Sequence, residues 1–293
     1  NDKILTTSLQ EMSILLNKKL AEKFKKNNKK VKSSVVQFVN DINKFSEEAF
    51  SKNNLSYDEN EIANLEKLKE EVKKSYKNNV ALNSINLSIN KNKIIGLLGP
   101  NGSGKTTFIK LAVGLLKPTS GEILIDGLPI GVETKKIISY LPDRDYLDKN
   151  QSIDSLIQLF LDFYPDFDEN VAREMLKDLK IDTDAKFKAL SKGNREKVQL
   201  ILAMSRKAKL FLLDEPIAGV DPVTRDYILN TIVRNYSKDA TLIISTHLIN
   251  DVEKILDEVI FVNNGDILLY DSIENIKKEH NVSIDEYFRE VFK

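Results

Sequence analysis

The nine residues GPNGSGKTT, at positions 99–107, have the types and spacing of a phosphate-binding loop. They fit the pattern G-x-x-x-x-G-K-[ST], and they lie between an apolar run and an amphipathic stretch. Glycines let backbone N–H groups wrap the outer phosphates of a nucleotide, while Lys105 adds a point charge and the Thr106 hydroxyl can bind Mg²⁺. The loop therefore predicts a nucleoside triphosphate site with Mg²⁺ as a cofactor. The loop residues expected to contact the nucleotide are Asn101, Gly102, Ser103, Gly104, Lys105, Thr106 and Thr107.

Two adjacent carboxylates, Asp214 and Glu215, end the apolar run KLFLLDEP. Parallel sheets present their ligand-binding residues at this end of a strand. We expect Asp214 to hold Mg²⁺ through its water shell, and Glu215 to polarise the attacking water as a general base. Together with Lys105, these carboxylates predict a site that hydrolyses a nucleoside triphosphate.

The composition excludes several other kinds of chemistry. The 44 basic residues balance the 44 acidic ones, so no global field favours nucleic acid or an anionic membrane surface. The absence of cysteine excludes disulfides, thiolate metal sites and a cysteine nucleophile, and leaves only His247 and His280 as nitrogen ligands for zinc. The apolar runs are far shorter than the ~20 residues of a membrane-spanning helix. We therefore expect a chain that does not itself cross the membrane.

From residue 80 onward, β-branched runs alternate with amphipathic helical stretches. This alternation predicts an α/β fold with a mostly parallel sheet, an antiparallel β edge and helices packed on the sheet. Helical patterns within 142–200 predict a helical subdomain, and helices are also expected around 222–236 and 249–257. The motifs occur once, so the chain carries one nucleotide-binding unit.

The run ALSKGNREKVQLILAMSRKAKLFLLDEP, followed by AGVD and LIISTHLINDVE, resembles the nucleotide-binding subunit of ATP-binding cassette (ABC) transporters. The resemblance covers about residues 76–293 and implies the P-loop ATPase core of that family, with ATP as the nucleoside triphosphate. In the family, the stretch matching LSKGN begins a helix that reaches the γ-phosphate held by a second subunit. The resemblance therefore implies that Ser191, Gly193 and Asn194 bind nucleotide across a dimer.

Three further residues match positions with a role in the family. His247 matches the switch histidine, which contacts the γ-phosphate and orients the catalytic glutamate. Asp221 in AGVD matches the loop that couples the two nucleotide sites, and it also suits the N-cap of a helix that starts at Pro222. Tyr76 aligns with the aromatic residue that stacks on adenine.

Two positions depart from the family pattern. Asp143 stands where the family usually has a glutamine that touches Mg²⁺ and water, so a third metal-facing residue is expected there with a shorter, charged side chain. In the signature stretch, Lys192 replaces the more usual glycine and Asn194 replaces glutamine. The serine and the helix start remain.

Residues 1–74 lie outside the resemblance. They contain no glycine or proline, and apolar stripes such as Val31, Val35 and Phe38 predict helices. We expect a helical N-terminal extension over 1–74, acting as a regulatory domain, a partner-docking hairpin or foreign sequence, and a nucleotide-binding domain over 75–293. The family normally begins with a β-strand, whereas the charged run NEIANLEKLKEEVKKSY favours a helix that continues to Tyr76.

The resemblance implies an ATPase subunit that dimerises, as a homodimer or with a second ATPase subunit, and drives membrane-spanning permease subunits from the cytoplasmic face of the membrane. Stretches such as SYLPDRDYL and SIDEYFREVFK are similar to ATPases of Gram-positive peptide exporters, including the staphylococcal exporters of phenol-soluble modulins. Peptide export is therefore the expected function, with no nucleic-acid partner. Two alternatives stay open: a soluble ABC ATPase acting on nucleic acid or ribosomes, and a catalytically inert regulatory subunit.

Overall fold

The computed structural model describes residues 72–76 and 79–293. The helical extension expected over 1–74 lies outside the described residues, except for its last three. Within the described part of the chain, no helix has the combination of length and apolar character needed to span a membrane.

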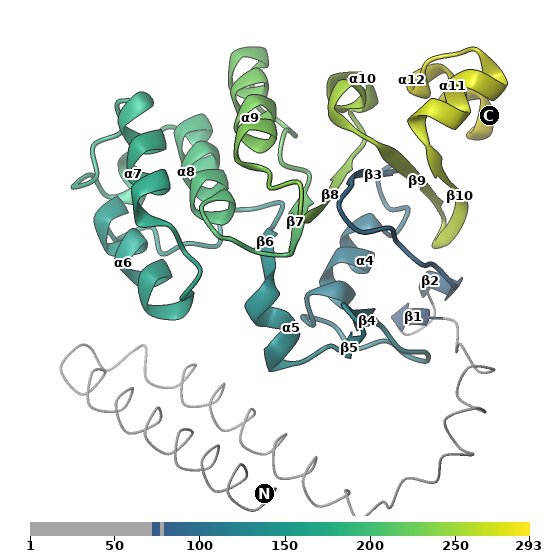
Figure 1. The fold of residues 1–293 in the computed structure, drawn as a ribbon, viewed down its shortest axis with the longest axis horizontal. Coiled ribbons are helices and arrows are strands. Elements are labelled where there is room, and N and C mark those ends of the chain that lie inside the picture. Colours follow the sequence, from purple (N-terminus) through teal and green to yellow (C-terminus); the bar gives the residue numbers. More distant parts are fainter. Residues whose placement is uncertain (1–71, 77–78) are drawn as a thin grey trace, which may run out of the picture. The chain divides into compact units, whose positions relative to one another are not determined.

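The centre of the fold is a six-stranded sheet in the order β10-β9-β3-β8-β7-β6 (Figure 1). Its strands are β3 (Ile94–Leu98), β6 (Ile138–Leu141), β7 (Leu210–Asp214), β8 (Thr241–Thr246), β9 (Glu258–Asn263) and β10 (Asp266–Ser272). Every pairing is parallel except that of β9 with β10 at one edge. The parallel strands are apolar runs because helices cover both of their faces. The predicted mostly parallel sheet with an antiparallel edge is confirmed.

Helices cover the two faces of this sheet, and others lie beside its edge. They are α4 (Lys105–Ala112), α5 (Val132–Ile137), α6 (Ile153–Phe163), α7 (Glu169–Asp178), α8 (Lys192–Met204), α9 (Pro222–Asn235), α10 (Ile249–Val252), α11 (Ile273–His280) and α12 (Ile284–Val291), with short 3₁₀ turns at Phe187–Ala189 and Glu253–Ile255. Ile95 and Leu97 of β3 pack with Ile109 of α4 on one face. Ile94 and Leu98 point to the opposite face, which α8, α9 and α10 cover. The two-residue period of the strand thus divides the core into two layers.

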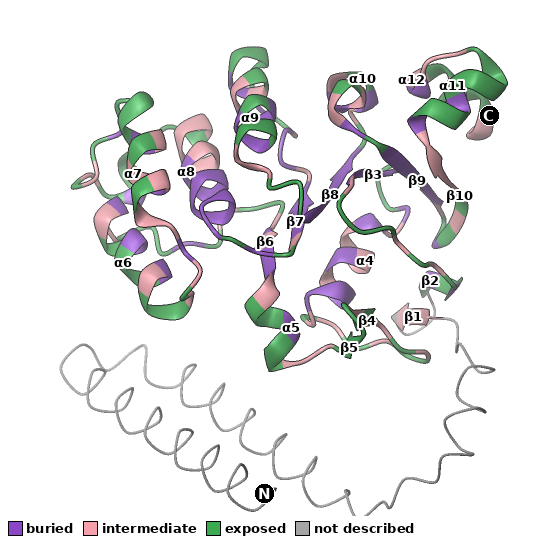
Figure 2. Ribbon diagram, viewed as in Figure 1, coloured by how far each residue is buried: buried purple, intermediate pink, exposed green. Residues whose placement is uncertain are grey.

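A third group of helices, α6, α7 and α8, surrounds a separate hydrophobic cluster beside the sheet edge at β6 (Figure 1). Serine or aspartate caps each helix: Ser152 for α6, Asp168 for α7 and Ser191 for α8. The face of α8 bearing Val198, Ile201 and Leu202 belongs to this cluster. Another face of α8, with Leu200, Ala203 and Met204, belongs to the core of the sheet. Figure 2 shows buried residues concentrated on α8 and in the central strands.

Residues Val72–Tyr76 form a strand, β1, which pairs antiparallel with β2 (Asn79–Ile85). The prediction of a helix that continues to Tyr76 is therefore wrong for these residues. The charged sequence VKKSY favours a helix locally, but Val72 packs against Leu82 and Ile85, and Lys73 pairs through its backbone with Ser120. Tertiary pairing thus overrides local propensity. A second small antiparallel pair consists of β4 (Leu124–Ile125) and β5 (Leu128–Pro129).

Arg206, just beyond α8, joins the helical cluster to the sheet. Its Nη2 lies 3.0 Å from both carboxylate oxygens of Asp166. The same guanidinium donates to the carbonyls of Ile138 and Lys136, and its Cζ lies 3.9 Å from the ring centroid of Tyr164. Because Arg206 is only 4% exposed, removing it would leave the carbonyl oxygen of Ile138 buried without its donor.

We expect Arg206→Met to lower the free energy of unfolding by about 2 kcal/mol, because the variant loses the charge-assisted hydrogen bonds of a buried guanidinium to a carboxylate that is 27% exposed. Urea unfolding followed by circular dichroism measures this change. Arg173→Met is the matched control, because Arg173 pairs with Asp154 and Glu169 at a side-chain exposure of 38%. That exposed network should contribute less than about 1 kcal/mol. Equal losses in the two variants would contradict the structural importance assigned to Arg206.

Candidate active site

The glycine-rich loop, residues 99–104, connects β3 to α4. Gly104 has a φ of 113°, and a Cβ there would lie 2.7 Å from the carbonyl oxygen of Ala81. A Cβ on Gly99 would lie 2.2 Å from the carbonyl oxygen of Val262. These two positions therefore require glycine. Since Gly104 precedes α4 and offers no side-chain cap, the first amides of α4 are available to an anion.

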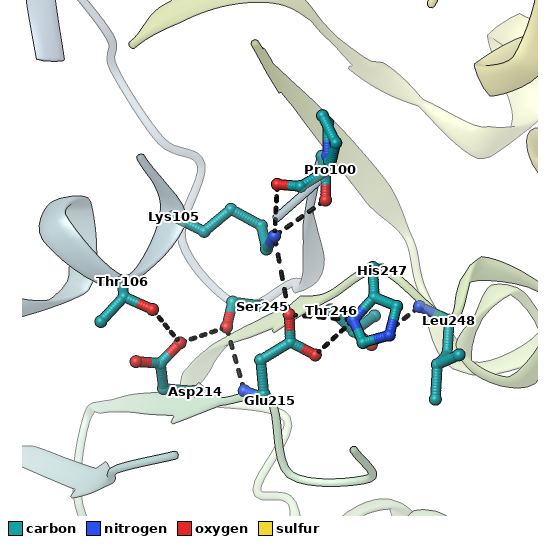
Figure 3. A network of polar contacts seen from close by, with 10 residues as sticks. Pro100, Lys105, Thr106, Asp214, Glu215, Ser245, Thr246, His247 and Leu248 are labelled. Carbon is teal, nitrogen blue, oxygen red and sulfur yellow. Dashed lines mark hydrogen bonds and ion pairs between the residues drawn. The ribbon is translucent and has the colours of Figure 1, made fainter. Parts of the chain in front are cut away.

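Lys105, the first residue of α4, turns back into this loop (Figure 3). Its Nζ donates to the carbonyl oxygens of Gly99 at 2.8 Å and Pro100 at 3.1 Å, and lies 3.6 Å from Oε1 of Glu215. Burial lowers the pKa of Lys105, and the nearby carboxylate of Glu215 opposes that shift. The ammonium group is thus held at the base of the loop by weak, neutral acceptors and one carboxylate.

Asp214 ends β7 and faces two hydroxyl groups. Ser245 Oγ donates to its Oδ1 at 2.6 Å, and Thr106 Oγ1 donates to the same oxygen at 3.2 Å. Burial raises the pKa of Asp214 despite these hydrogen bonds. Its Oδ2 is buried and has no hydrogen-bond partner among the described residues. An orphaned carboxylate oxygen beside a threonine hydroxyl fits the oxygen ligands that Mg²⁺ prefers.

Glu215 follows Asp214 in a left-handed conformation, with φ of 51°. Its backbone N–H is 3.0 Å from both the carbonyl oxygen and Oγ of Ser245. Its side chain is 14% exposed and lies with Oε2 3.1 Å from Nδ1 of His247 (Figure 3). The backbone turn therefore directs the carboxylate away from the strand, toward Lys105 and His247.

The side chains of Lys105, Glu215 and His247 border an open cleft of about 460 Å³. Its lining residues are Ala81, Asn101, Gly102, Ser103, Gly104, Lys105, Thr106, Thr107, Asp143, Glu215, Ala218 and His247. Ten of these were expected from the sequence, and the cleft brings Asp143 to the same space as the glycine-rich loop. Asp143 is exposed and lies two residues after the end of β6. Its charge contributes to the raised pKa of Asp214.

Among the described side chains, five expected residues are absent from the lining of this cleft: Asp214, which is 1% exposed, and four residues at the starts of α8 and α9. Ser191, Gly193 and Asn194 are at the N-terminus of α8, where Ser191 Oγ accepts the N–H of Asn194 at 3.3 Å. Asp221 is the N-cap of α9, and it accepts from Thr224 N at 3.0 Å. Its hydrogen bonds with Thr224 lower the pKa of Asp221. The expected N-cap is confirmed.

Tyr76 is the last residue of β1, and its Cα pairs with that of Asn79. The placement of its side chain lies outside the described part of the chain, so the expected stacking on adenine stays a prediction.

The sequence analysis missed Ser245, which contacts both Asp214 and Glu215. A signal for it exists, because Ser245 and Thr246 are polar residues that end an otherwise apolar strand, directly before His247. Strand order and register decide whether Ser245 or Thr246 lies opposite Asp214 of β7. The sequence specifies neither directly.

Comparisons with known proteins agree with this geometry. Residues 82–218 match a family model described as "ABC transporter". The chain is 30% identical over 235 residues to the lipopolysaccharide export system ATP-binding protein LptB of Haemophilus influenzae, covering 76% of this chain and 97% of LptB. It is 31% identical over 201 residues to the SkfA peptide export ATP-binding protein SkfE of Bacillus subtilis, covering 67% and 84%.

Among solved structures, an ATP-binding subunit of an ABC transporter superposes with a TM-score of 0.70 at 24% identity, covering 76% of this chain and 98% of that one. This likeness confirms the fold. The identity and coverage of the two sequence relatives go further, because 97% of the length of LptB aligns with this chain. The chain therefore belongs to the ABC transporter family, as an ATP-binding subunit and an ATPase.

Proposed function

We propose that two ATPase subunits close head to tail around two ATP molecules, hydrolyse them with Mg²⁺, and drive membrane permease subunits that export peptides. The observation that supports this proposal is that the expected nucleotide-binding residues lie in two separate places within one chain. Lys105, Glu215 and His247 border the cleft, whereas Ser191 and Gly193 at the start of α8 do not. The N-terminus of α8 is capped by Ser191 and can also bind an anion, which the nucleotide of a second subunit would supply.

The chemistry assigned to each residue follows from the contacts around Glu215. Lys105 would exchange its carbonyl partners for the outer phosphates of ATP, since a charged acceptor binds an ammonium more strongly than a neutral one. Mg²⁺, when bound, supplies positive charge to the phosphates, and Asp214 and Thr106 would hold it with Asp143 facing it. Glu215 would take the proton of the attacking water, and His247 would orient that carboxylate.

Hydrogen bonds between α8 and the segment that carries Asp143 support coupling of the two halves of the site. Asp145, two residues after Asp143, lies 3.0 Å from Arg195 Nε and 3.3 Å from Gln199 Nε2. Arg195 also donates to the carbonyl of Leu190, immediately before Ser191. Movement of the segment that carries Asp143 would therefore move the start of α8. This is the link through which nucleotide binding would reach the helical cluster.

Peptides are the proposed cargo because SkfE, whose name states peptide export, aligns over 84% of its length. LptB, whose name states lipopolysaccharide export, aligns at a similar identity, so the ATPase itself does not distinguish the two cargoes. Copurified permease subunits reconstituted with this ATPase in vesicles would test the cargo. ATP-dependent accumulation of a labelled amphipathic peptide supports the proposal, and its absence alongside accumulation of a glycolipid contradicts it.

We expect Ser191→Arg to lower the ATPase rate about tenfold at low protein concentration, because a bulky cation would replace the cap that faces the partner's nucleotide. In the unchanged protein, the rate should rise as the square of concentration. Ser283→Arg is the matched control, since Ser283 caps α12 in the same way, away from the cleft. Both variants lose an N-cap, which costs about 1 kcal/mol of stability.

Mixing gives a second test of the shared site. A Ser191→Arg chain retains Lys105, and a Lys105→Met chain retains Ser191, so a mixed dimer contains one complete site. Activity should return when the two inactive variants are combined. A linear dependence on concentration, or no recovery on mixing, would show that one chain suffices and would overturn the proposed dimer.

A further inference from the structure

Ser245 is a fully buried residue of β8 that lies directly opposite Asp214 of β7. Its hydroxyl group makes two hydrogen bonds of opposite sense (Figure 3). It donates to Asp214 Oδ1 at 2.6 Å and accepts from the backbone N–H of Glu215 at 3.0 Å. One oxygen atom thus joins the side chain of one carboxylate residue to the backbone of the next.

The first hydrogen bond determines which oxygen of Asp214 is engaged. Ser245 and Thr106 both donate to Oδ1, and Oδ2 remains without a partner among the described residues. A carboxylate with one oxygen held in this way has a fixed rotamer and presents the other oxygen in a fixed direction. Hydrogen bonds to ligand carboxylates are known to orient them and to affect metal affinity 10–100-fold.

The second hydrogen bond fixes the turn at Glu215. A non-glycine residue with φ of 51° is uncommon, and such a conformation persists where surrounding contacts hold it. Here the N–H of Glu215 has two acceptors, the carbonyl oxygen and Oγ of Ser245, both at 3.0 Å. The hydroxyl therefore adds a second restraint on the direction in which the carboxylate of Glu215 leaves the strand.

We propose that Ser245 is a positioning residue for ATP hydrolysis, whose hydroxyl group holds the side chain of Asp214 and the backbone of Glu215 in one fixed relation. This inference rests on the roles proposed above for Asp214 as a metal ligand and Glu215 as a base. Ser245 touches neither nucleotide nor metal in this role. It acts through the two carboxylate residues.

A matched serine separates this role from the general cost of losing a buried hydroxyl group. Ser139 of β6 is 2% exposed and donates to the carbonyl of Ala203 at 2.7 Å. It lies in the same sheet and outside the lining of the cleft. Ser139→Ala therefore removes a comparable buried hydrogen bond without touching Asp214 or Glu215.

The experiment compares Ser245→Ala, Ser139→Ala and Ser245→Thr in the full chain, by steady-state kinetics and by Mn²⁺ binding. Electron paramagnetic resonance measures Mn²⁺ binding to protein loaded with a non-hydrolysable ATP analogue. For Ser245→Ala, we expect kcat to fall about tenfold with KM for ATP within about twofold, and the Mn²⁺ concentration for half-saturation to rise about tenfold. Ser139→Ala should change none of these, and Ser245→Thr, which keeps the hydroxyl, should recover most of the rate.

Unchanged kcat and Mn²⁺ saturation in Ser245→Ala would overturn the inference, as would equal losses in Ser139→Ala. Ser245→Cys keeps the size of the side chain with a weaker donor, and it should show the same losses if Ser245→Ala does not fold. The Glu215→Gln variant distinguishes failure of the proposed general base from failure of the positioning role of Ser245. If Glu215→Gln keeps its rate, the proposed base is wrong; if it loses its rate while Ser245→Ala and Ser245→Cys keep theirs, only the positioning role fails.

Discussion

Replacing Glu215 by glutamine should lower kcat for ATP hydrolysis about 10³-fold, because a general base contributes 10²–10⁴-fold and an amide cannot accept the proton of the attacking water. ATP binding should change by less than about twofold. Lys105 would then face a neutral amide in place of the carboxylate that lies 3.6 Å from its Nζ, and this leaves more of its charge for phosphate. The variant should therefore collect in the ATP-bound, closed dimer.

Two measurements check this prediction: phosphate release under saturating ATP, and molecular mass by light scattering with and without ATP. Glu258→Gln is the matched control, since Glu258 is a buried glutamate of the same sheet that accepts from Asn90 Nδ2 at 3.0 Å at the start of β9. It should keep its kcat. A Glu215→Gln variant with normal turnover would remove Glu215 as the base.

Replacing Lys105 by methionine should weaken ATP binding roughly 10²-fold. Methionine keeps much of the apolar stem and removes the ammonium group, and charge-assisted hydrogen bonds to phosphate contribute about 1.5–3 kcal/mol each. The buried position enlarges the effect, because a desolvated ammonium whose pKa is already lowered gains more from an anionic partner than an exposed one does.

Titration of the protein with a fluorescent ATP analogue measures this loss. Lys110→Met is the control within the same helix, since Lys110 lies in the last turn of α4 and outside the lining of the cleft. It should bind ATP with an unchanged Kd. Equal affinity in Lys105→Met and the unchanged protein would contradict the placement of the outer phosphates at the glycine-rich loop.

The contrast between Gly104 and Tyr76 shows how far the sequence alone predicts this protein. The glycine-rich loop is local, since its function depends on residues adjacent in the chain, and the structure places those residues around one cleft. Tyr76 belongs to a strand that exists only because β2 pairs with it, so a local pattern rich in lysine predicted a helix instead. Pairing partners distant in sequence are not encoded in helical propensity.

Ser245 and Asp143 show a second limit. The contacts of Ser245 arise from the register of β7 beside β8, where Asp214 lies opposite it. A shift of one residue would turn its side chain to the other face of the sheet, so its contact with Asp214 could not be read from the sequence. Asp143 was expected near the metal from the resemblance alone, and its position in the cleft depends on the segment after β6 that Asp145 ties to α8.

The two buried faces of α8 restrict how this region can evolve in length. Each residue advances a helix by about 100°, so a single insertion or deletion within 198–204 would rotate one end of α8 relative to the other. Side chains that pack in the core of the sheet would then point into the helical cluster. Side chains of the helical cluster would point into the core of the sheet. Natural length variation should therefore accumulate in the segments that connect α8 to the neighbouring elements, while α8 keeps a constant number of residues.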